Sequence, residues 1–325
     1  MDDDYPRNIK EFESRFNNQE ACRDYLFRLR WPEGFRCPRC GAGKAWPFRS
    51  TRLVCAACGH QTSVTAGTIF QDTRTPLVEW FRAIWWVTSQ KNGASALGLQ
   101  RVLGLGSYKT AWTWLHKLSI RRAMIRPGRE RLSGHVEVDE TYIGGLEEGV
   151  HGRQTDTKAL VIIACEARGR GVGRIRLRHI PDASAASIQA FIQEAIEPGS
   201  VVHTDGWEGY GGVKAVGYKH KVTVLSRRRQ SPSDLLPRVH LVASLLKRWL
   251  LGTHQGAVSR EHLAYYLDEF TFRFNRRKSK SRGKLFYRLI QQAVAVEPAP
   301  YKAMVKCYAA TNRRKPQPVG VSCIK

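Results

Sequence analysis

The pattern of hydrophobic and polar positions changes character near residue 135. In several stretches before that point, apolar residues recur every three or four positions, the spacing of one face of an α-helix. Thr75 before Pro76 is a typical helix start, and Ser107 is a good N-cap. This part of the chain is therefore predicted to be helical in a lead-in within residues 1–32, from Thr75 to about Gln90, over 95–103 and from Ser107 to Arg122.

From residue 135 onward the pattern becomes that of β-strands, with short β-branched runs bounded by Gly, Pro and Asp. Three such runs come first, then a helical stretch, then two further runs and more helices. That order predicts an α/β fold with a central mixed sheet and helices on both faces. The expected strands are 135–143, 159–166, 173–180, 200–205 and 219–225, with a helix over 183–195 and further helices from about 234.

Two of these apolar runs each deliver an aspartate, Asp139 and Asp205. A carboxylate on or at the end of a buried strand is costly unless something pairs with it. In so basic a chain, two of them indicate a divalent metal site that acts on phosphates. The helix expected after Asp205 carries His240 and Lys247, which share a face because seven residues are close to two helical turns.

Several motifs resemble the catalytic domain of bacterial insertion-sequence transposases of the zinc-ribbon DDE, ISXO2-like type. Val-Glu-Val-Asp-Glu-Thr-Tyr-Ile-Gly-Gly at 136–145 is close to that family's first strand. The final helices are similar over 244–248 and from Tyr266 to Arg277. The resemblance covers roughly residues 15 to 295 and implies a ribonuclease H-like domain. It also implies two catalytic aspartates, a third ligand that is Glu, Asn or His, and a lysine seven residues further on.

Applied to this chain, the resemblance makes Asp139, Asp205, His240 and Lys247 the catalytic candidates. The first three are the expected ligands of Mg²⁺ or Mn²⁺, and Lys247 is expected to contact a phosphate. His240 is a departure, because many relatives have a carboxylate or amide there. The alternative is that His240 is a helix-surface residue and that another acid, such as Glu137 or Asp234, completes the site.

The chain of 325 residues has 53 Lys and Arg against 28 Asp and Glu, a net charge of +25. Such an excess favours a polyanionic partner, usually nucleic acid, over a basic surface that only maintains solubility. The acidic start predicts no secretory signal, and no run of eighteen apolar residues predicts a membrane span. We therefore expect a protein of the bacterial cytoplasm, associated with the nucleoid, whose cysteines stay reduced.

Four of the eight cysteines form two matched pairs. Cys37 and Cys40 make one CxxC, Cys55 and Cys58 make the second, and a glycine follows each pair. Two residues between cysteines let both thiolates of a turn reach one tetrahedral ion. A redox dithiol is the alternative, but it needs only one pair. A structural Zn²⁺ site is predicted, in a zinc ribbon over residues 33–70 with a hairpin between the pairs.

The helices around Gly104-Leu105-Gly106 have the spacing of a helix-turn-helix. We assign residues 75–126 to this DNA-binding segment, although a plain helical linker has a similar pattern. On its last helix Ala111, Trp112, Leu115 and Leu118 are expected to face the core. The residues expected to face solvent or a DNA groove are Ser107, Tyr108, Lys109, Thr113 and Lys117.

Two further basic segments lie within the region 135–296 that we assign to the transposase-like domain. One is a polar loop with Arg227, Arg228 and Arg229, and the other contains Arg276 and Arg277. Both are predicted to contact DNA phosphates, the alternative being solvated charge. The proline-containing residues 297–325 are expected to form a loosely ordered tail.

Together these observations predict a DNA transposase. Its partners are the terminal inverted repeats of its element and a target DNA, and it is expected to act as a homo-oligomer on DNA. The reaction is metal-dependent cleavage at the ends followed by joining of the 3′ ends. Two alternatives stay open: a ribonuclease H-like, structure-selective nuclease, and a zinc-ribbon DNA-binding regulator without catalytic activity.

Overall fold

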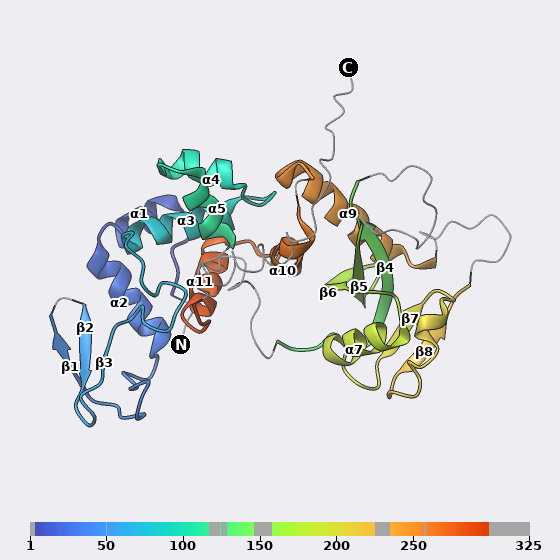
Figure 1. Cartoon of the computed structure of the whole chain (residues 1–325), viewed down its shortest axis with the longest axis horizontal. Coiled ribbons are helices and arrows are strands. Elements are labelled where there is room, and N and C mark those ends of the chain that lie inside the picture. Colours follow the sequence, from blue (N-terminus) through green and yellow to red (C-terminus); the bar gives the residue numbers. More distant parts are fainter. Residues whose placement is uncertain are drawn as a thin grey trace, which may run out of the picture.

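The computed structural model describes residues 4–49, 51–116, 124, 129–145, 158–224, 235–256 and 258–298. Its first part is mainly helical and includes a small antiparallel sheet of order β1-β2-β3 (Figure 1). The elements of this part are α1 (Ile9–Arg15), α2 (Gln19–Arg30), β1 (Ala45–Phe48), β2 (Arg52–Cys55), β3 (Gln61–Thr62), α3 (Leu77–Ser89), α4 (Ala96–Leu103) and α5 (Tyr108–His116).

The second part is built on a five-stranded sheet of order β6-β5-β4-β7-β8. Strand β5 is antiparallel to both β4 and β6, whereas β4, β7 and β8 are parallel. Its elements are β4 (His135–Ile143), β5 (Ala159–Arg168), β6 (Gly171–Ile180), α7 (Ala185–Ala195), β7 (Val201–Thr204), the short η1 (Glu208–Tyr210), β8 (Lys219–Val222), α9 (Pro237–His254), η2 (Arg260–His262), α10 (Leu263–Asn275) and α11 (Arg282–Ala293).

Helices cover both faces of this sheet, so its central strands are buried on both sides. Residues 159–165 of β5 are all buried, which explains why that strand is a continuous apolar run rather than an alternating one. One face packs against α9 and α10, and the other packs against α7 and η1. The mixed sheet, with three antiparallel strands followed by a helix and parallel strands, confirms the ribonuclease H-like fold class.

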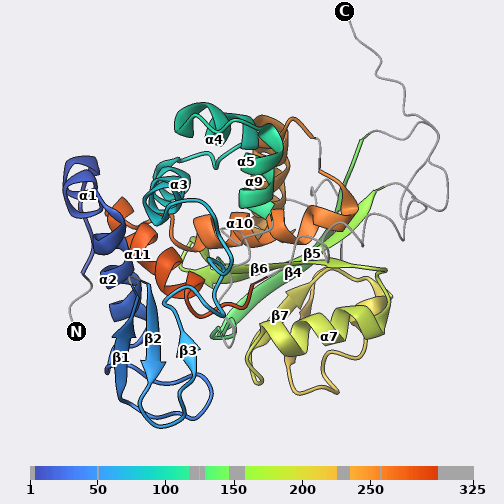
Figure 2. The same cartoon turned by 60° about the vertical axis from the view of Figure 1, so that its left-hand side comes forward.

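The helices of the first part share an aromatic core with the last helix, α11. Phe286 of α11 lies 5.3 Å from Phe12 and 5.6 Å from Trp85, measured between ring centroids. The N-terminal segment crosses α11 so closely that a Cβ on Gly283 would collide with the carbonyl oxygen of Pro6. Figure 2 shows α11 among the N-terminal helices rather than on the sheet. The packing thus separates α11 from the rest of residues 135–296, which the sequence pattern had grouped together.

Within the expected helix-turn-helix, the residues at the turn behave as the sequence indicated. Ser95 caps α4 through its side chain, and Gly104 ends it in the left-handed conformation, at φ 63°. On α5, however, the fully buried tryptophan is Trp114, stacked 4.1 Å from Trp80, whereas Trp112 is only half-buried. Ala111 is buried, and the helical period of 3.6 residues places Trp114 and Leu115 on the same face. Trp112, one residue after Ala111, therefore lies at the side of that face.

The helical unit is joined to the sheet unit at the C-terminal end of α3. Arg273 of α10 donates hydrogen bonds of 2.9 and 2.8 Å to the carbonyl oxygens of Val87 and Gln90. Its guanidinium is paired with the buried Glu269 at 2.8 Å. From α9, Trp249 and Thr253 donate to the carbonyl oxygen of Asn92. These bonds set how α3–α5 lie relative to the catalytic candidates. None of the described helices is both long enough and apolar enough to cross a membrane.

Candidate active site

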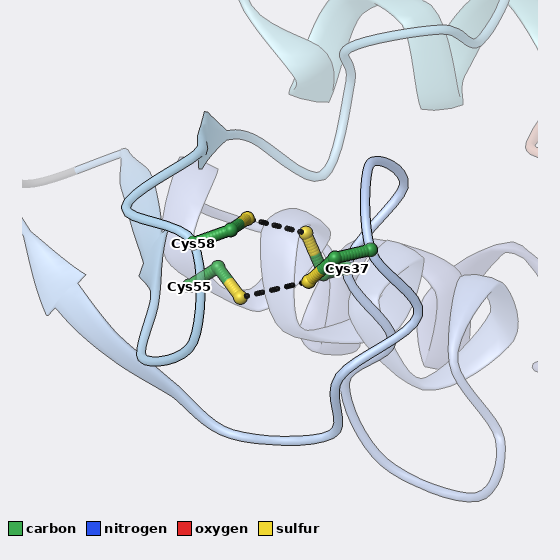
Figure 3. A group of neighbouring side chains, drawn as sticks. Cys37, Cys55 and Cys58 are labelled. Atoms are coloured by element: carbon green, nitrogen blue, oxygen red, sulfur yellow. Dashed lines mark hydrogen bonds between the residues drawn. The ribbon is translucent and has the colours of Figure 1, made fainter.

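The four paired cysteines converge at the base of the β1–β2 hairpin (Figure 3). Their sulfur atoms all lie within 4.8 Å of one another. The Sγ atoms of Cys37 and Cys58 are 3.7 Å apart, and those of Cys40 and Cys55 are 3.6 Å apart. A tetrahedral ion with Zn–S bonds of about 2.3 Å needs sulfur separations of roughly 3.8 Å. The donor set and its spacing therefore fit Zn²⁺.

The catalytic candidates lie on the opposite side of the molecule from this cluster, around β4. The anchor of the region is Glu137, whose side chain is 1% exposed. Its Oε2 accepts hydrogen bonds from the backbone N–H groups of Arg238 and Val239, at 2.8 and 3.1 Å, and its Oε1 is 2.6 Å from Nη1 of Arg238. Leu236 at the N-cap of α9 offers no side-chain acceptor. Glu137 therefore caps α9 from the neighbouring strand.

Asp139 follows two positions later and points to the same face of β4 as Glu137. Strand β4 pairs in parallel with β7, with Glu137 opposite His203. Continuing this register by two residues sets Asp139 opposite Asp205, which follows the last residue of β7. Both are partly exposed. Asp139 accepts from the N–H of Glu140 at 2.8 Å, and Asp205 accepts from the N–H of Trp207 at 3.0 Å. The fold thus brings together two carboxylates that are far apart in sequence.

Helix α9 presents His240 to this pair. Nε2 of His240 lies 3.7 Å from Oδ2 of Asp139. Burial lowers the pKa of His240, and the carboxylates of Glu137 and Asp205 oppose that effect only in part. The imidazole is therefore predominantly neutral at pH 7, the form that binds a metal ion. Lys247, two turns further along the same helix, is exposed.

The catalytic candidates are less tightly clustered than the cysteines. Among the described residues, the four cysteines are the one set of three or more potential ligands whose atoms lie within 4.8 Å of one another. Of the three candidate ligands, Asp139 and His240 lie 3.7 Å apart, and the carboxylate of Asp205 is near enough to act on the pKa of His240. Two carboxylates and a neutral imidazole suit Mg²⁺ or Mn²⁺, with the imidazole favouring manganese.

The neighbouring acids have other partners. Glu140 points to the opposite face of β4, where its Oε1 accepts a 2.6 Å hydrogen bond from the hydroxyl of Tyr210. On α10, Glu269 forms an ion pair with Arg273. Burial raises the pKa of Asp268 to about 7, and the charge of Arg129 opposes that rise only in part. Glu137, named as a competing ligand, uses both oxygens on α9. It supports the site without being positioned as a ligand.

The residues predicted to contact DNA have mixed surroundings. Ser107, Tyr108 and Lys109 are exposed at the start of α5, with Tyr108 52% exposed, whereas Thr113 is half-buried. Lys117 and the loop with Arg227, Arg228 and Arg229 lie outside the described residues.

The second predicted basic segment, at the end of α10, is tied to the protein itself. Arg277 donates to the carbonyl oxygens of Phe274, Gly173 and Val172, and it stacks 4.0 Å from the ring centroid of Phe274. Arg276 stacks on Phe272 at 4.1 Å. Contact of these two arginines with phosphate stays a prediction, and Arg277 has a structural role that its sequence context did not indicate.

Comparison with known proteins matches two parts of the chain. Residues 131–275, which contain all four catalytic candidates, match the ISXO2-like transposase domain, and residues 17–61 match the transposase zinc-ribbon domain. The four-cysteine cluster thus lies in the segment that is similar to a transposase zinc ribbon, ahead of the segment that is similar to a transposase domain.

A relative from Halobacterium salinarum, described as an uncharacterized protein in transposable element ISH50, is 27% identical over 282 residues, which is 79% of this chain and 91% of the relative. Similar solved structures include the catalytic core of BIV integrase, at 15% identity over 55% of this chain and 98% of that one, with a TM-score of 0.28. The Mos1 strand transfer complex is 16% identical over 71% and 77% of the two chains, with a TM-score of 0.27.

Two features of the site were missed from the sequence. One is the capping of α9 by Glu137, and the other is the attachment of α3 by the Glu269–Arg273 pair. The spacing of Glu269 and Arg273, four residues apart on a helix, signals the pair but not its target. The absence of a Ser, Thr, Asp or Asn just before Pro237 was a usable signal that the cap of α9 comes from elsewhere.

Removing one cysteine tests the zinc ribbon. Cys40→Ser should lower the bound zinc from one per chain to near zero and unfold residues 33–70, because structural zinc supplies the folding energy of so small a module. Elemental analysis and limited proteolysis of the full chain measure both effects. The matched control is Cys22→Ser, outside the cluster, which should keep its zinc. Fully folded, zinc-free wild-type protein would show that the cluster is not a metal site.

Replacing Glu137 by glutamine tests the anchor of α9. The change keeps the side-chain size but leaves the Arg238 guanidinium without its carboxylate, so we expect the free energy of unfolding to fall by about 3 kcal/mol. Urea denaturation of the full chain measures it. Glu197→Gln, at an exposed position, should change it by less than about 0.5 kcal/mol. Equal effects of the two substitutions would contradict the capping role.

Proposed function

We propose that the protein is a DNA transposase that cleaves the ends of its insertion element and joins them to target DNA. The observation that carries this proposal is the convergence of Asp139, Asp205 and His240, from β4, the end of β7 and α9, on one face of a ribonuclease H-like sheet within the transposase domain. The partners are the terminal inverted repeats of the element and the target DNA. Assembly of several copies on DNA is part of the proposal.

Each of these residues has a definite task in the proposed reaction. Asp139 and Asp205 offer carboxylate oxygens, and the neutral imidazole of His240 offers a nitrogen. A divalent ion bound there supplies charge relief at the phosphate and lowers the pKa of the attacking water or 3′-hydroxyl. Lys247 binds a phosphate oxygen as a point charge. Glu137 keeps α9, and with it His240 and Lys247, in register with β4.

DNA recognition is assigned to the start of α5. Ser107, Tyr108 and Lys109 are presented there at the N-terminal end of the second helix of a helix-turn-helix, the end that reads base edges in the major groove. The bonds from Arg273 to the end of α3, and from Trp249 and Thr253 to Asn92, couple that helical unit to the catalytic face. Binding of the element end by α5 thereby places the adjoining phosphodiester near Asp139.

Neutralising either aspartate should abolish catalysis without abolishing DNA binding. Asp139→Asn and Asp205→Asn each remove an anionic ligand at constant size. Strand transfer should therefore fall by more than about 100-fold, which is the largest loss usual for a residue that only supports a metal ligand. The assay uses DNA ends that flank the native gene, with Mg²⁺ or Mn²⁺. Asp24→Asn, an exposed acid on α2, is the matched control and should retain full activity. Cleavage without joining by the wild-type chain would instead identify a nuclease, and binding alone a regulator.

The same assay tests His240. If its imidazole binds the ion, His240→Ala should lower activity by orders of magnitude, and less in Mn²⁺ than in Mg²⁺, because the remaining oxygen ligands hold manganese better. His240→Glu restores the carboxylate that many relatives use and should regain part of the activity. A silent His240→Ala, together with loss of activity in Glu137→Asp at unchanged stability, would move the third ligand to Glu137.

Substitution on α5 tests the reading helix. Lys109→Ala should weaken binding of the element end by about 1–3 kcal/mol while leaving random DNA of equal length nearly unaffected. Fluorescence anisotropy with both DNAs at fixed salt measures the difference. Lys10→Ala, an exposed lysine on α1, is the control. If Lys109→Ala weakens both DNAs equally, Lys109 binds phosphate and α5 is not the reading helix.

A further inference from the structure

A cavity of about 820 Å³ lies at the junction of the helical unit and the sheet. Its walls come from β6, from α10 and the residues after it, from α11 and from the segment at Arg129–Glu130 that leads into β4. Seven of the side chains that line it are Lys or Arg, and one, Glu130, is acidic. The cavity therefore has an excess of positive charge, and both the sheet unit and the helical unit contribute to it.

This cavity is separate from the catalytic residues. Arg176 of β6 is paired with Ala164 of β5, whereas the next residue, Leu177, is paired with Ile163, which is itself paired with Asp139. Because neighbouring residues of a strand point to opposite faces, Arg176 lies on the other face of the sheet from Asp139. A ligand in the cavity does not occupy the catalytic site.

Arg176 is the most informative residue of the cavity. It is 5% exposed, and its guanidinium donates to the carbonyl oxygens of Ile175 and Glu130, at 2.9 and 2.5 Å. Within the described residues it forms no ion pair. Arg174, beside it, is already neutralised by Glu166 and Glu130, at 2.6 and 3.0 Å. A buried cation without a carboxylate is costly, and an anion in the cavity would offset that cost.

Nearby cations increase the demand for an anion. Burial lowers the pKa of Arg176 to about 10, and repulsion by Arg129, Arg174 and Arg276 contributes to the same shift, which the carboxylate of Glu166 opposes only in part. Arg276, Lys278, Lys284 and Arg288 line the remaining wall. Arginine forks and lysine ammonium groups gathered around one space are the usual binding groups for phosphate.

One polar group indicates that the ligand carries more than phosphate. Gln292 of α11 lines the cavity and is 8% exposed, and its Oε1 accepts no hydrogen bond from any described residue. A buried acceptor of this kind needs a donor. The bases and terminal hydroxyls of nucleic acids provide donors next to their phosphates, whereas inorganic phosphate at neutral pH provides few.

We propose that this cavity binds one or two nucleotides of a DNA strand, with phosphates on Arg176, Lys278 and Arg288 and a nucleotide donor on Gln292. Because α11 belongs to the helical core and Arg176 to the sheet, such a strand bridges the two units. The proposal rests on DNA being the partner in the proposed function, but it needs neither Asp139 nor a metal ion. It adds a second strand-binding site away from the catalytic carboxylates.

The test uses the full chain and a labelled twelve-nucleotide single strand, titrated by fluorescence anisotropy without divalent ions at several salt concentrations. The double variant Lys278→Gln/Arg288→Gln should bind at least about 10-fold more weakly. The plot of log affinity against log salt should become shallower by roughly 1.4. Each lost phosphate contact with a single strand contributes about 0.7 to that slope, and two contacts are lost. The control Lys214→Gln/Lys219→Gln removes two exposed charges elsewhere and should lose less than about 3-fold.

Two further measurements separate the possible ligands. Gln292→Leu should weaken binding of the strand but not of sodium pyrophosphate, measured by calorimetry, and unchanged thermal melting confirms that the variant folds. Equal loss in the two double variants would overturn the proposal. The proposal would also be overturned if Lys278→Gln/Arg288→Gln abolished the binding of pyrophosphate but left the binding of the strand unchanged. The cavity would then be a site for free anions. Asp139→Asn should bind the strand like wild type. A strand-transfer assay without product would therefore contradict the proposed function but would leave the measured binding of the strand to the cavity unchanged.

Discussion

The candidate catalytic face depends on one buried carboxylate. Glu137 is the third residue of β4, and its two oxygens accept from the first N–H groups of α9 and from the guanidinium of Arg238. Pro237, at the first position of the helix, has no N–H to satisfy, so Glu137 accounts for the donors of the next two residues. Arg238 also binds the carbonyl oxygens of Gly169 and Gly171 at the β5–β6 turn. One ionic group thus aligns a strand, a helix and a hairpin.

This arrangement explains how side chains from three separate segments meet. The apolar stripe of α9 (Val239, Val242, Ala243, Leu246 and Leu250) packs on the sheet and fixes the rotation of the helix. The contact with Glu137 fixes its position along the helix axis. With both settled, His240 lies beside Asp139, and Lys247 lies two turns further along. Packing alone tolerates a slide of a helix over an apolar face, whereas a buried, hydrogen-bonded carboxylate does not.

The second constraint is the junction between the two units. Their sequences are separated by the segment before β4, yet they are held together by the chain's last helices, since α10 carries Arg273 to the end of α3 and α11 completes the N-terminal core. The same junction contains the basic cavity with Arg176 and Gln292. The proposed recognition by the helical unit and the proposed chemistry on the sheet would therefore be coupled through α10 and α11. A DNA strand in the cavity would contact both units at once.

Much of this protein could be predicted from local sequence. The strands are bounded by β-branched runs and turn residues, so 135–143 was predicted to the residue, and the others differ by a few residues at their ends. The matched CxxC pairs determine the zinc ribbon, because four thiolates at that spacing fit one ion. The family resemblance over 136–145 marked Asp139 as a catalytic candidate, and the parallel pairing of β4 with β7 places Asp205 beside it.

Tertiary structure decided what depends on contacts between distant segments. Packing between distant segments buries Trp114 instead of Trp112 and brings α11 into the first core. It also lets Arg277 bind the backbone of β6. For α11 and Arg277 the partners are more than a hundred residues away in the sequence. The cavity around Arg176 has the same origin, because its cations come from four segments whose charges look like ordinary surface charge in the sequence. Local pattern determines the elements and the four cysteine ligands of the zinc ribbon. Which face of each element is covered, and which charges end up buried together, is determined only when the whole chain is packed.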